Sequence, residues 1–388
     1  MRIFLVCQQS IYNHPIPAYQ FWKTYFRNGI AEAGYEWVEA QDVDWAKGLV
    51  NLDKYSLKKW REHSWNITVD SIKKQHQIKP IDIFLSYLFP QQVELQAVQE
   101  IQLLGIPCIN FFCDNVRNFL KIPKEFSCFD IHWVPEFKAI KMYQQAGLRY
   151  VYAPMPVWIP PHKRTYCHPE NYGISFIGSQ DIQREALLAQ VLKLGISLEI
   201  RGEGWNQENN TEFIERFQDK NLLKTFINQL DFLQRDGFLS YKEKIMHKFQ
   251  PKKKKYQFQN SIKAKPNPQE YTQIIQESLI TLGINRYPSF RYPFSQPDTY
   301  SRMRDIEAPM MGACYLTEWT EGLNHLYDLG EEIETYHSSE ELVEKIRELE
   351  KNSEKRKNMR YKAQRRALAE HTVARSISKI SDALGLKK

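Results

Sequence analysis

Arginines and glycines gather in three short segments of the C-terminal half, and each segment could hold an anion. In the first, Gly178 and Ser179 form a turn that leads to Arg184, at the start of a predicted helix. Backbone amides at a helix N-terminus attract anions, and a guanidinium adds a fixed positive charge. The plain alternative is a structural turn, because glycine often precedes a helix for conformational reasons alone.

The second segment, 201–205, begins with Arg201 and Gly202. It is not the dinucleotide-binding GxGxxG motif, because the third glycine and the downstream pattern are absent. Its two glycines either let the backbone approach a ligand or form an ordinary turn, and the sequence favours neither.

The third segment, 300–317, carries the strongest pattern. Tyr300 precedes a short predicted helix that contains Arg304 and Glu307 and stops at Gly312. A buried glutamate can accept hydrogen bonds from both hydroxyls of a ribose, and an arginine can neutralise a diphosphate. Spacing alone slightly favours the alternative, in which an arginine–glutamate pair simply covers the end of the helix.

Two residues of the N-terminal half are candidates for acid–base chemistry. Asp114 ends a buried predicted strand and could act as a base or orient an acceptor hydroxyl. Capping of the following turn explains it equally well. His14 follows the first predicted strand, where a loop would reach an acceptor, and its plain alternative is a histidine that faces solvent.

A repeated alternation of strands and helices must position these residues. The first half predicts strands at 2–7, 81–85, 106–112, 131–134 and 150–153, with helices at 19–33, 93–104 and 137–146. The second half predicts strands at 174–177, 198–201, 279–284 and 314–317, with helices at 182–193 and 303–311, one opened by a capping box at 338–341, and two more over 353–385 with a cap at Thr372. Such alternation predicts parallel sheets with helices on both faces.

The sequence therefore predicts an α/β fold of two Rossmann-like domains that face a cleft. We expect the domains at 1–155 and 173–360, a proline-rich linker at 156–172, and C-terminal helices at 361–388 that cross back to the first domain. Segment 206–270 interrupts the alternation with an amphipathic helix at 213–232 and a lysine-rich run. We interpret it as an insertion that takes no part in the sheet.

Composition excludes several classes of protein. Residues 242–265 hold nine lysines and one glutamate, so the rest of the 388-residue chain carries a charge near −1 although the total is +7. A nucleic-acid-coating protein usually has a wider basic surface. The six cysteines form no CxxC pair, which favours a reducing compartment. Because no apolar run suits a signal peptide or a spanning helix, we expect a cytoplasmic protein, peripheral at most on the inner membrane face.

A family resemblance rests on these residues. Segment 302–317 has an arginine before a Glu-Ala pair, a glycine turn and a short strand, and Gly330-Glu331-Glu332-Ile333 follows. This region resembles the C-terminal part of CgeB-like glycosyltransferases, which are spore-maturation-type members of the GT-B superfamily. The pieces 174–184, 201–205, 105–114 and 371–375 resemble the same family. The likeness covers roughly three quarters of the chain and is absent from 206–270.

The resemblance implies a nucleotide-sugar donor bound to the second domain, with Glu307 holding its ribose. Related retaining enzymes usually carry a second glutamate eight residues earlier, but here that position is Thr299, beside Asp298. The departure leaves the sugar and the retaining outcome open.

We therefore expect a glycosyltransferase that needs no metal or other cofactor. Arg184, Arg304 and helix N-termini would stabilise the charge that develops on the diphosphate. The acceptor is unidentified: a glycan, a lipid-linked molecule or a protein. Lys252–Lys255 could contact an anionic surface, or they could be merely solvated. The alternatives are an epimerase or phosphorylase on the same fold, and a non-catalytic binding module that uses the lysine-rich insertion.

Overall fold

The computed structural model divides the chain into two compact units. Unit 1 comprises Met1–Pro160 and Ala367–Lys388, and unit 2 comprises Pro161–Arg366. The residues that the structure describes are 1–14, 19–205, 238–246, 258–288, 292–294 and 296–386. The helix expected at 213–232 and the lysines Lys252–Lys255 lie outside the described residues.

Unit 1 is built on a sheet of six parallel strands in the order β2-β1-β3-β4-β5-β6. The central strands are mainly apolar and are buried along their length, as expected for a parallel sheet covered on both faces. The strands are β1 (Arg2–Val6), β2 (Glu36–Val38), β3 (Ile83–Ser86), β4 (Cys108–Phe111), β5 (Ile131–Val134) and β6 (Tyr150–Tyr152).

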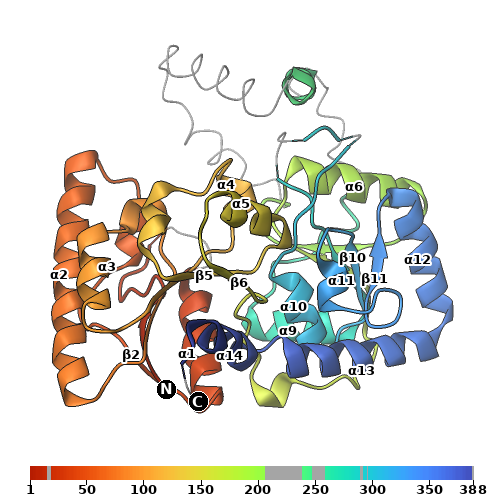
Figure 1. The fold of residues 1–388 in the computed structure, drawn as a ribbon. Coiled ribbons are helices and arrows are strands. Elements are labelled where there is room, and N and C mark those ends of the chain that lie inside the picture. Colours follow the sequence, from red (N-terminus) through yellow and green to blue (C-terminus); the bar gives the residue numbers. More distant parts are fainter. Residues whose placement is uncertain (15–18, 206–237, 247–257, 289–291, 295, 387–388) are drawn as a thin grey trace. The chain divides into compact units, whose positions relative to one another are not determined.

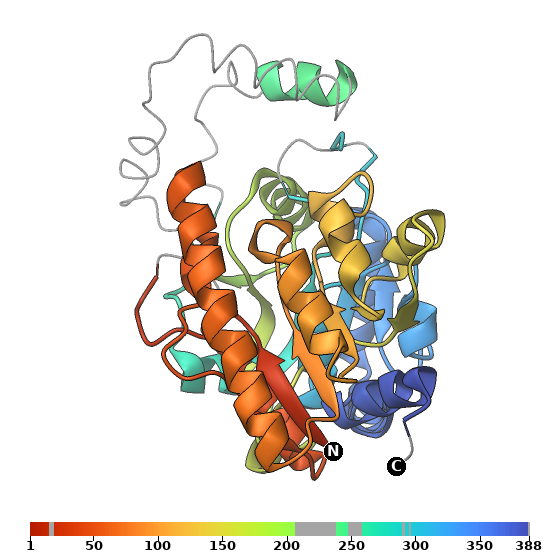
Figure 2. The same cartoon turned by 60° about the vertical axis from the view of Figure 1, so that its left-hand side comes forward.

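Helices cover this sheet, and one of them comes from the C-terminus. Helix α14 (Val373–Leu384) packs against α1 (Tyr19–Glu32), where a Cβ on Gly29 would lie 2.4 Å from a methyl group of Val373. The absence of a side chain at Gly29 therefore permits the contact. The long α2 (Lys54–Ile78) runs beside α3 (Leu95–Gln102), as Figure 2 shows. The shorter helices are α4 (Asn115–Asn118) and α5 (Ile140–Gln145).

Unit 2 contains a second parallel sheet, in the order β11-β10-β9-β7-β8. Figure 1 shows its helices on both sides of the strands. The strands are β7 (Tyr172–Ile177), β8 (Glu199–Arg201), β9 (Ser278–Gly283), β10 (Tyr315–Glu318) and β11 (Glu334–Tyr336). The helices are α6 (Ile182–Lys193), α9 (Pro268–Glu277), α10 (Arg304–Met310), α11 (Leu323–Leu326), α12 (Ser339–Lys351) and α13 (Ser353–Glu370), which runs across the boundary between the units.

The α/β class and the two Rossmann-like sheets are confirmed, but one part of the insertion was interpreted wrongly. Residues 261–263 pair with β8, because the Ile200 amide donates to the Ser261 carbonyl and the Lys263 amide donates to the Ile200 carbonyl, at 2.8 and 2.9 Å. Phe258 is buried against Trp205, with 5.6 Å between ring centroids. Segment 258–263 therefore extends the edge of the sheet, and apolar packing holds it there.

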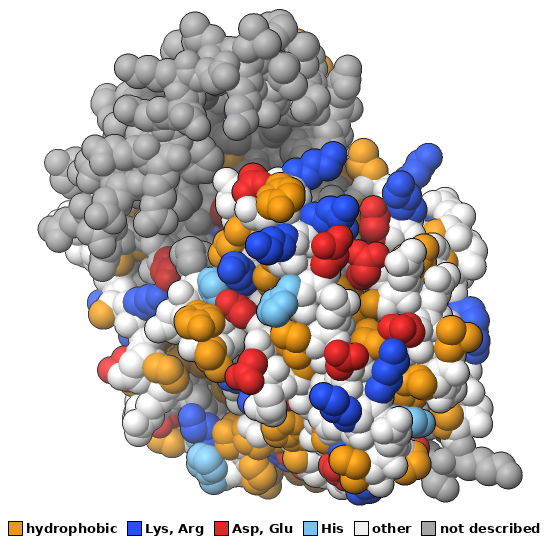
Figure 3. Space-filling view, turned by 90° about the vertical axis from the view of Figure 1, so that its left-hand side faces the viewer, with side chains coloured by type: hydrophobic (Ala, Val, Ile, Leu, Met, Phe, Trp, Pro, Cys, Tyr) orange, Lys and Arg blue, Asp and Glu red, His pale blue; other side chains and the backbone are white. Residues whose placement is uncertain are grey.

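The surface on the α2 side of unit 1 mixes acidic, basic and apolar side chains without a large patch of one sign (Figure 3). Such mixing agrees with a chain that is nearly neutral outside its lysine-rich segment. Among the described residues, no helix combines the length and the apolar character needed to cross a bilayer.

Candidate functional site

The order of the strands in unit 2 predicts where a ligand would bind. The chain passes from β7 to β8 on one side and then to β9 on the other, so the connections diverge between β7 and β9. In open parallel sheets, ligands bind outside the carboxyl ends of the strands at such a switch point. The segments that follow β7 and β9, together with the start of α10, therefore form the candidate donor site.

The turn after β7 is fixed by its own side chains. Arg184 donates from Nη1 to the carbonyl and the hydroxyl of Ser179, at 2.7 and 3.1 Å. Asp181 caps α6 by accepting from the amides of Gln183 and Arg184 at 2.9 and 3.1 Å. Two first-turn amides that were expected to bind an anion thus donate to the protein's own carboxylate, and the Arg184 guanidinium remains the candidate anion-binding group of this turn.

Arg304 and Glu307 form the pair expected at the start of α10. Arg304 lies 3.4 Å from Glu307, atom Nε to Oε2, and its Nη2 donates to the carbonyl of Ile177 at the end of β7. Glu307 is only 3 % exposed and accepts a short hydrogen bond from the Tyr271 hydroxyl. The Arg304 guanidinium also lies over the Tyr271 ring, 4.9 Å from its centroid.

Tyr271 belongs to α9, which the sequence reasoning missed. The signal was present, because Asn267 and Glu270 form a capping box with Pro268 at the first helical position. The side chain of each residue accepts a hydrogen bond from the backbone amide of the other. Reading that box as a helix start would have placed Tyr271 one turn into a helix that faces the site.

Arg302 supplies a third guanidinium. Its Nη2 donates to the carbonyl of Arg286, just after β9, and its Cζ lies 4.5 Å from the centre of the Tyr300 ring. Its Nε is buried and has no hydrogen-bond partner among the described residues. Tyr300 is itself buried and packs against the ring of Tyr287 at 4.7 Å.

The three arginines concentrate positive charge at this edge. Burial, together with the charges of Arg302 and Arg304, lowers the pKa of Arg184 to about 10, although the charge of Asp181 opposes this shift. Guanidinium groups that disfavour one another's charge are stabilised by a bound anion. The structure therefore brings Arg184, Arg302, Arg304 and Glu307 together, and they form what we call the arginine cluster.

Asp305 holds the loop that carries this cluster, although the sequence reasoning assigned it no role. Its buried carboxylate accepts from the Arg302 amide at 2.8 Å and from the Tyr315 hydroxyl at 2.8 Å. Asn285 reaches the same carboxylate at 3.2 Å and the Glu318 carbonyl at 2.9 Å. Burial raises the pKa of Asp305, and these hydrogen bonds lower it. Asp305 thus joins the ends of β9 and β10 to the start of α10.

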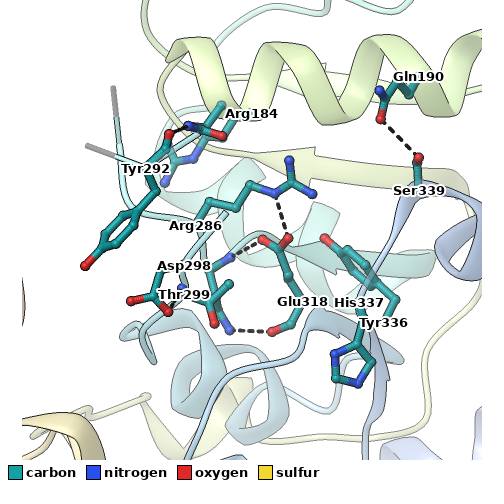
Figure 4. A network of polar contacts seen from close by, with 12 residues as sticks. Arg184, Gln190, Arg286, Tyr292, Asp298, Thr299, Glu318, Tyr336, His337 and Ser339 are labelled. Atoms are coloured by element: carbon teal, nitrogen blue, oxygen red, sulfur yellow. Dashed lines mark hydrogen bonds and ion pairs between the residues drawn. The ribbon is translucent and has the colours of Figure 1, made fainter. Parts of the chain in front are cut away.

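A buried ion pair lies beside Asp305. Nε of Arg286 donates to Oε1 of Glu318 at 2.6 Å (Figure 4). Burial raises the pKa of Glu318, and the Arg286 guanidinium lowers it. Thr299, the position at which the resemblance implies a glutamate, pairs with Arg286 in an antiparallel bridge, and its amide donates to Asp298.

Three of the expected donor-binding residues serve local structure instead. Gly202 has φ +138°, and a Cβ there would lie 2.1 Å from the carbonyl oxygen of Gly178, so the missing side chain of Gly202 allows the two turns to meet. Arg201 turns to Glu199, at 2.6 Å. Gly312 follows the C-terminal end of α10, where a Cβ would lie 2.3 Å from the Thr165 carbonyl. The structure does not bring Arg201 or Gly312 to the arginine cluster.

In unit 1, Asp114 follows β4 at the carboxyl edge of the sheet. Its side chain makes no capping hydrogen bond to α4, so the capping alternative is wrong. The Asn115 amide donates instead to Glu136, which follows β5, at 2.7 Å. Burial raises the pKa of Glu136 well above its usual range, and the charge of Asp114 raises it further. The two carboxyl groups therefore lie near each other.

His14 follows β1 and is paired rather than merely solvated. Its Nε2 lies 2.9 and 3.1 Å from the two carboxylate oxygens of Asp44. Asp44 also lines a cavity of about 170 Å³ beyond the ends of β1 and β2. Its lining includes the charged and polar residues Ser10, Lys23, Arg27, Glu39 and Asp42. Asp42 has φ +61°, a conformation that is uncommon outside glycine and often marks functional loops.

No group of three or more histidine, cysteine, aspartate or glutamate side chains is arranged to hold a metal ion in the described part of the chain. The two candidate sites thus offer cations, carboxylates and one histidine as their chemical groups.

The comparisons with known proteins agree with the geometry of unit 2. Residues 251–382, about a third of the chain, match the model of a family described as glycosyl transferase-like. This segment includes β9, α10 and β10, and with them the arginine cluster apart from Arg184. A search of curated proteins found no match.

Solved structures of glycosyltransferases share the whole fold. HepE of Anabaena, solved with UDP and glucose, is 10 % identical with a TM-score of 0.57, and 99 % of each chain is covered. Sucrose-phosphate synthase of Thermosynechococcus elongatus gives the same values. A glycosyltransferase of Rickettsia africae is 13 % identical with a TM-score of 0.56, covering 98 % of this chain and 97 % of that one. At such identities the likeness shows the fold, which is that of GT-B glycosyltransferases.

Proposed function

We propose that this chain is a glycosyltransferase that moves a sugar from a nucleotide-sugar donor to an acceptor hydroxyl. The observation that carries the proposal is the arginine cluster at the switch point of the unit 2 sheet. Three guanidinium groups converge there with a carboxylate that is almost fully buried. Their charges suit a diphosphate, and a buried glutamate suits the two hydroxyls of a ribose.

The chemistry follows from this arrangement. As the bond between the sugar and the diphosphate breaks, negative charge develops on the leaving phosphate. Fixed guanidinium groups in a site of low dielectric stabilise that charge without reorganising. They perform the task that a divalent metal would otherwise perform, so we propose that transfer is independent of metal. HepE was solved with UDP and with UDP-glucose, which supports the same class of donor here.

We assign the acceptor to unit 1, on the evidence of His14, Asp44 and the adjoining cavity. A histidine oriented by a carboxylate is suited to take a proton from a hydroxyl. Asp114, with Glu136 beside it, is the second candidate base. Related enzymes that the resemblance points to retain the anomeric configuration, whereas direct displacement by a hydroxyl that His14 or Asp114 activates would invert it. The anomeric configuration of the product, observed by NMR, decides between the two.

The proposal predicts turnover of a nucleotide-sugar. The full-length protein, incubated with UDP-, GDP-, ADP- and CMP-sugars, should release free nucleotide from one of them, even slowly with water as the acceptor. Arg304→Met should slow that release by about 10²- to 10³-fold, the usual effect of removing one group that stabilises developing charge. EDTA should not change the rate.

A matched control is Arg347→Met, which removes an exposed arginine whose one hydrogen bond within the described residues is to the Leu194 carbonyl. It should release nucleotide at the wild-type rate. Conversion of one nucleotide-sugar into another without release would instead indicate an epimerase. If no nucleotide-sugar is consumed, the proposed function is wrong, and loss of activity in EDTA would refute metal independence alone.

A further inference from the structure

Arg286 and Glu318 form a buried ion pair that the proposed diphosphate contacts do not use. Arg286 follows β9 and Glu318 ends β10, so the pair lies at the carboxyl edge of the sheet in unit 2. Their side chains are 7 % and 2 % exposed. Burying two charges costs several kcal/mol of desolvation per ion, so such a pair is weak evidence for a purely stabilising role.

The guanidinium of Arg286 has hydrogen-bond donors that the ion pair with Glu318 does not use. Glu318 Oε1 accepts from Nε of Arg286, and its Oε2 accepts from the Asn285 amide at 3.2 Å. Figure 4 shows the outer end of the guanidinium extending beyond the carboxylate. Within the described residues, Nη1 and Nη2 of Arg286 make no hydrogen bond. A buried guanidinium with unused donors is costly unless a ligand or water completes it.

The position of the pair relates it to the arginine cluster. β9 lies next to β7 in the sheet, and the Arg286 carbonyl accepts from Arg302. The cluster supplies surplus positive charge, whereas the Arg286 charge is balanced by Glu318. A charge-balanced pair that still offers N–H donors suits a neutral hydroxyl group better than a second anion.

We infer that Arg286 binds the hydroxyl groups of the donor's sugar and so selects which sugar is used, with Glu318 as the positioning residue that holds its guanidinium. This inference rests on the proposed function and adds the contact that distinguishes a nucleotide-sugar from the nucleotide alone. Arg286 is a specificity residue by this account, and the arginine cluster binds the diphosphate.

Calorimetric titration of the full-length protein tests the inference. Wild type and Arg286→Met are titrated with UDP, GDP and ADP and with their hexose conjugates. A lost hydrogen bond from a charged donor should weaken binding of the preferred nucleotide-sugar by about 10- to 100-fold. The affinity for the corresponding nucleoside diphosphate should stay within about threefold, since the arginine cluster is intact. Glu318→Gln should act in the same direction.

Arg356→Met is the matched control, because Arg356 is another buried arginine of unit 2 in an ion pair, with Glu170 at 2.6 and 2.9 Å. It should lose stability but keep the preference for nucleotide-sugar over nucleotide. Equal weakening of both ligands in Arg286→Met would show that Arg286 binds phosphate, and no weakening of either would show that the pair is structural. Both results overturn the inference alone, whereas a wild type that binds no nucleotide contradicts the proposed function as well.

Discussion

The protonation of the buried Glu136 carboxyl group depends on its neighbours in the unit 1 site, so its effect on stability tests the arrangement of that site. It accepts from the Asn115 amide and follows β5, next to the turn that carries Asp114. Burial and the charge of Asp114 both favour its protonated form. Glu136 therefore keeps a proton in the fold at a pH where the unfolded chain has lost it. Its pKa is raised, so its contribution to stability falls as the pH rises above about 4.3, the usual value for glutamate.

Substitution Glu136→Gln should remove this pH dependence. Glutamine can still accept from Asn115 but does not ionise. The melting temperature of the variant relative to wild type should therefore rise steadily from pH 4.5 to pH 8. Only wild type loses folding free energy as the pH rises, because its Glu136 must stay protonated in the fold. Thermal denaturation of both proteins at several pH values measures this difference in melting temperature. Other carboxyl groups, such as Asp305, titrate in both proteins, so their contributions cancel. A difference that does not change with pH would show that Glu136 is ionised in the fold.

At the scale of elements, two glycine turns decide the shape of the donor side. Gly178 and Gly202 follow the adjacent strands β7 and β8, and their backbones meet because Gly202 has no Cβ. The Gly178 amide donates to the Arg201 carbonyl at 2.8 Å, and Trp205 Nε1 donates to the Gly178 carbonyl at 2.8 Å. The turn that carries Arg184 is thus braced by the neighbouring turn.

Gly202→Ala should therefore destabilise the protein by about 3 kcal/mol or more, from a left-handed backbone and a clash with the Gly178 carbonyl together. Gly195→Ala is the control: Gly195 also has positive φ, +86°, but a Cβ there meets nothing within 4 Å. It should lose only about 1–2 kcal/mol. Urea denaturation measures both, and equal losses would mean that the close approach of the two turns contributes nothing.

Elements with strong periodicity could be predicted from the sequence, and short or polar ones could not. The helix expected at 182–193 is α6, because Leu187, Leu188 and Val191 form a buried apolar stripe. Helix α2 was missed because its buried face includes Ser64 and Thr68, which weaken the apolar pattern. The edge strands β2 and β11, of three residues each, were missed as well.

The residues of the candidate site likewise divide into those that could be predicted from the sequence and those that could not. Arg184, Arg304 and Glu307 could be found because each follows a predicted strand or opens a predicted helix, and parallel strands bring such positions to one edge. The pair of Arg286 with Glu318 could not be found, because its members are 32 residues apart and only the register of β9 with β10 brings them together. The roles of Arg201 and Gly312 were predicted from their local motifs, whereas packing turns the Arg201 side chain to Glu199 and places Gly312 against the Thr165 carbonyl.

At the scale of the whole molecule, both units place their candidate groups at the carboxyl edge of a parallel sheet. In unit 2 these groups are the arginine cluster and the Arg286–Glu318 pair. In unit 1 they are the His14–Asp44 pair with its cavity, and Asp114 with Glu136. In unit 2 the guanidinium groups suit stabilisation of a leaving diphosphate, and in unit 1 His14 and the carboxyl groups suit activation of a hydroxyl, which are the two tasks of the proposed transfer.

The central claim, that unit 2 binds a nucleotide through the arginine cluster, is tested most directly by the melting temperature of the full chain with UDP, GDP, ADP, CMP and their sugars, for wild type and Glu307→Ala. A ligand that binds only the native state stabilises it by about 2.7 kcal/mol at 100 times its Kd. Glu334→Ala is the control, since Glu334 is equally buried in unit 2 but pairs with Lys345 and Lys355. We predict that one nucleotide raises the melting temperature of wild type and Glu334→Ala but not of Glu307→Ala. A wild type that responds to none of them, or an equal response in Glu307→Ala, would contradict the account.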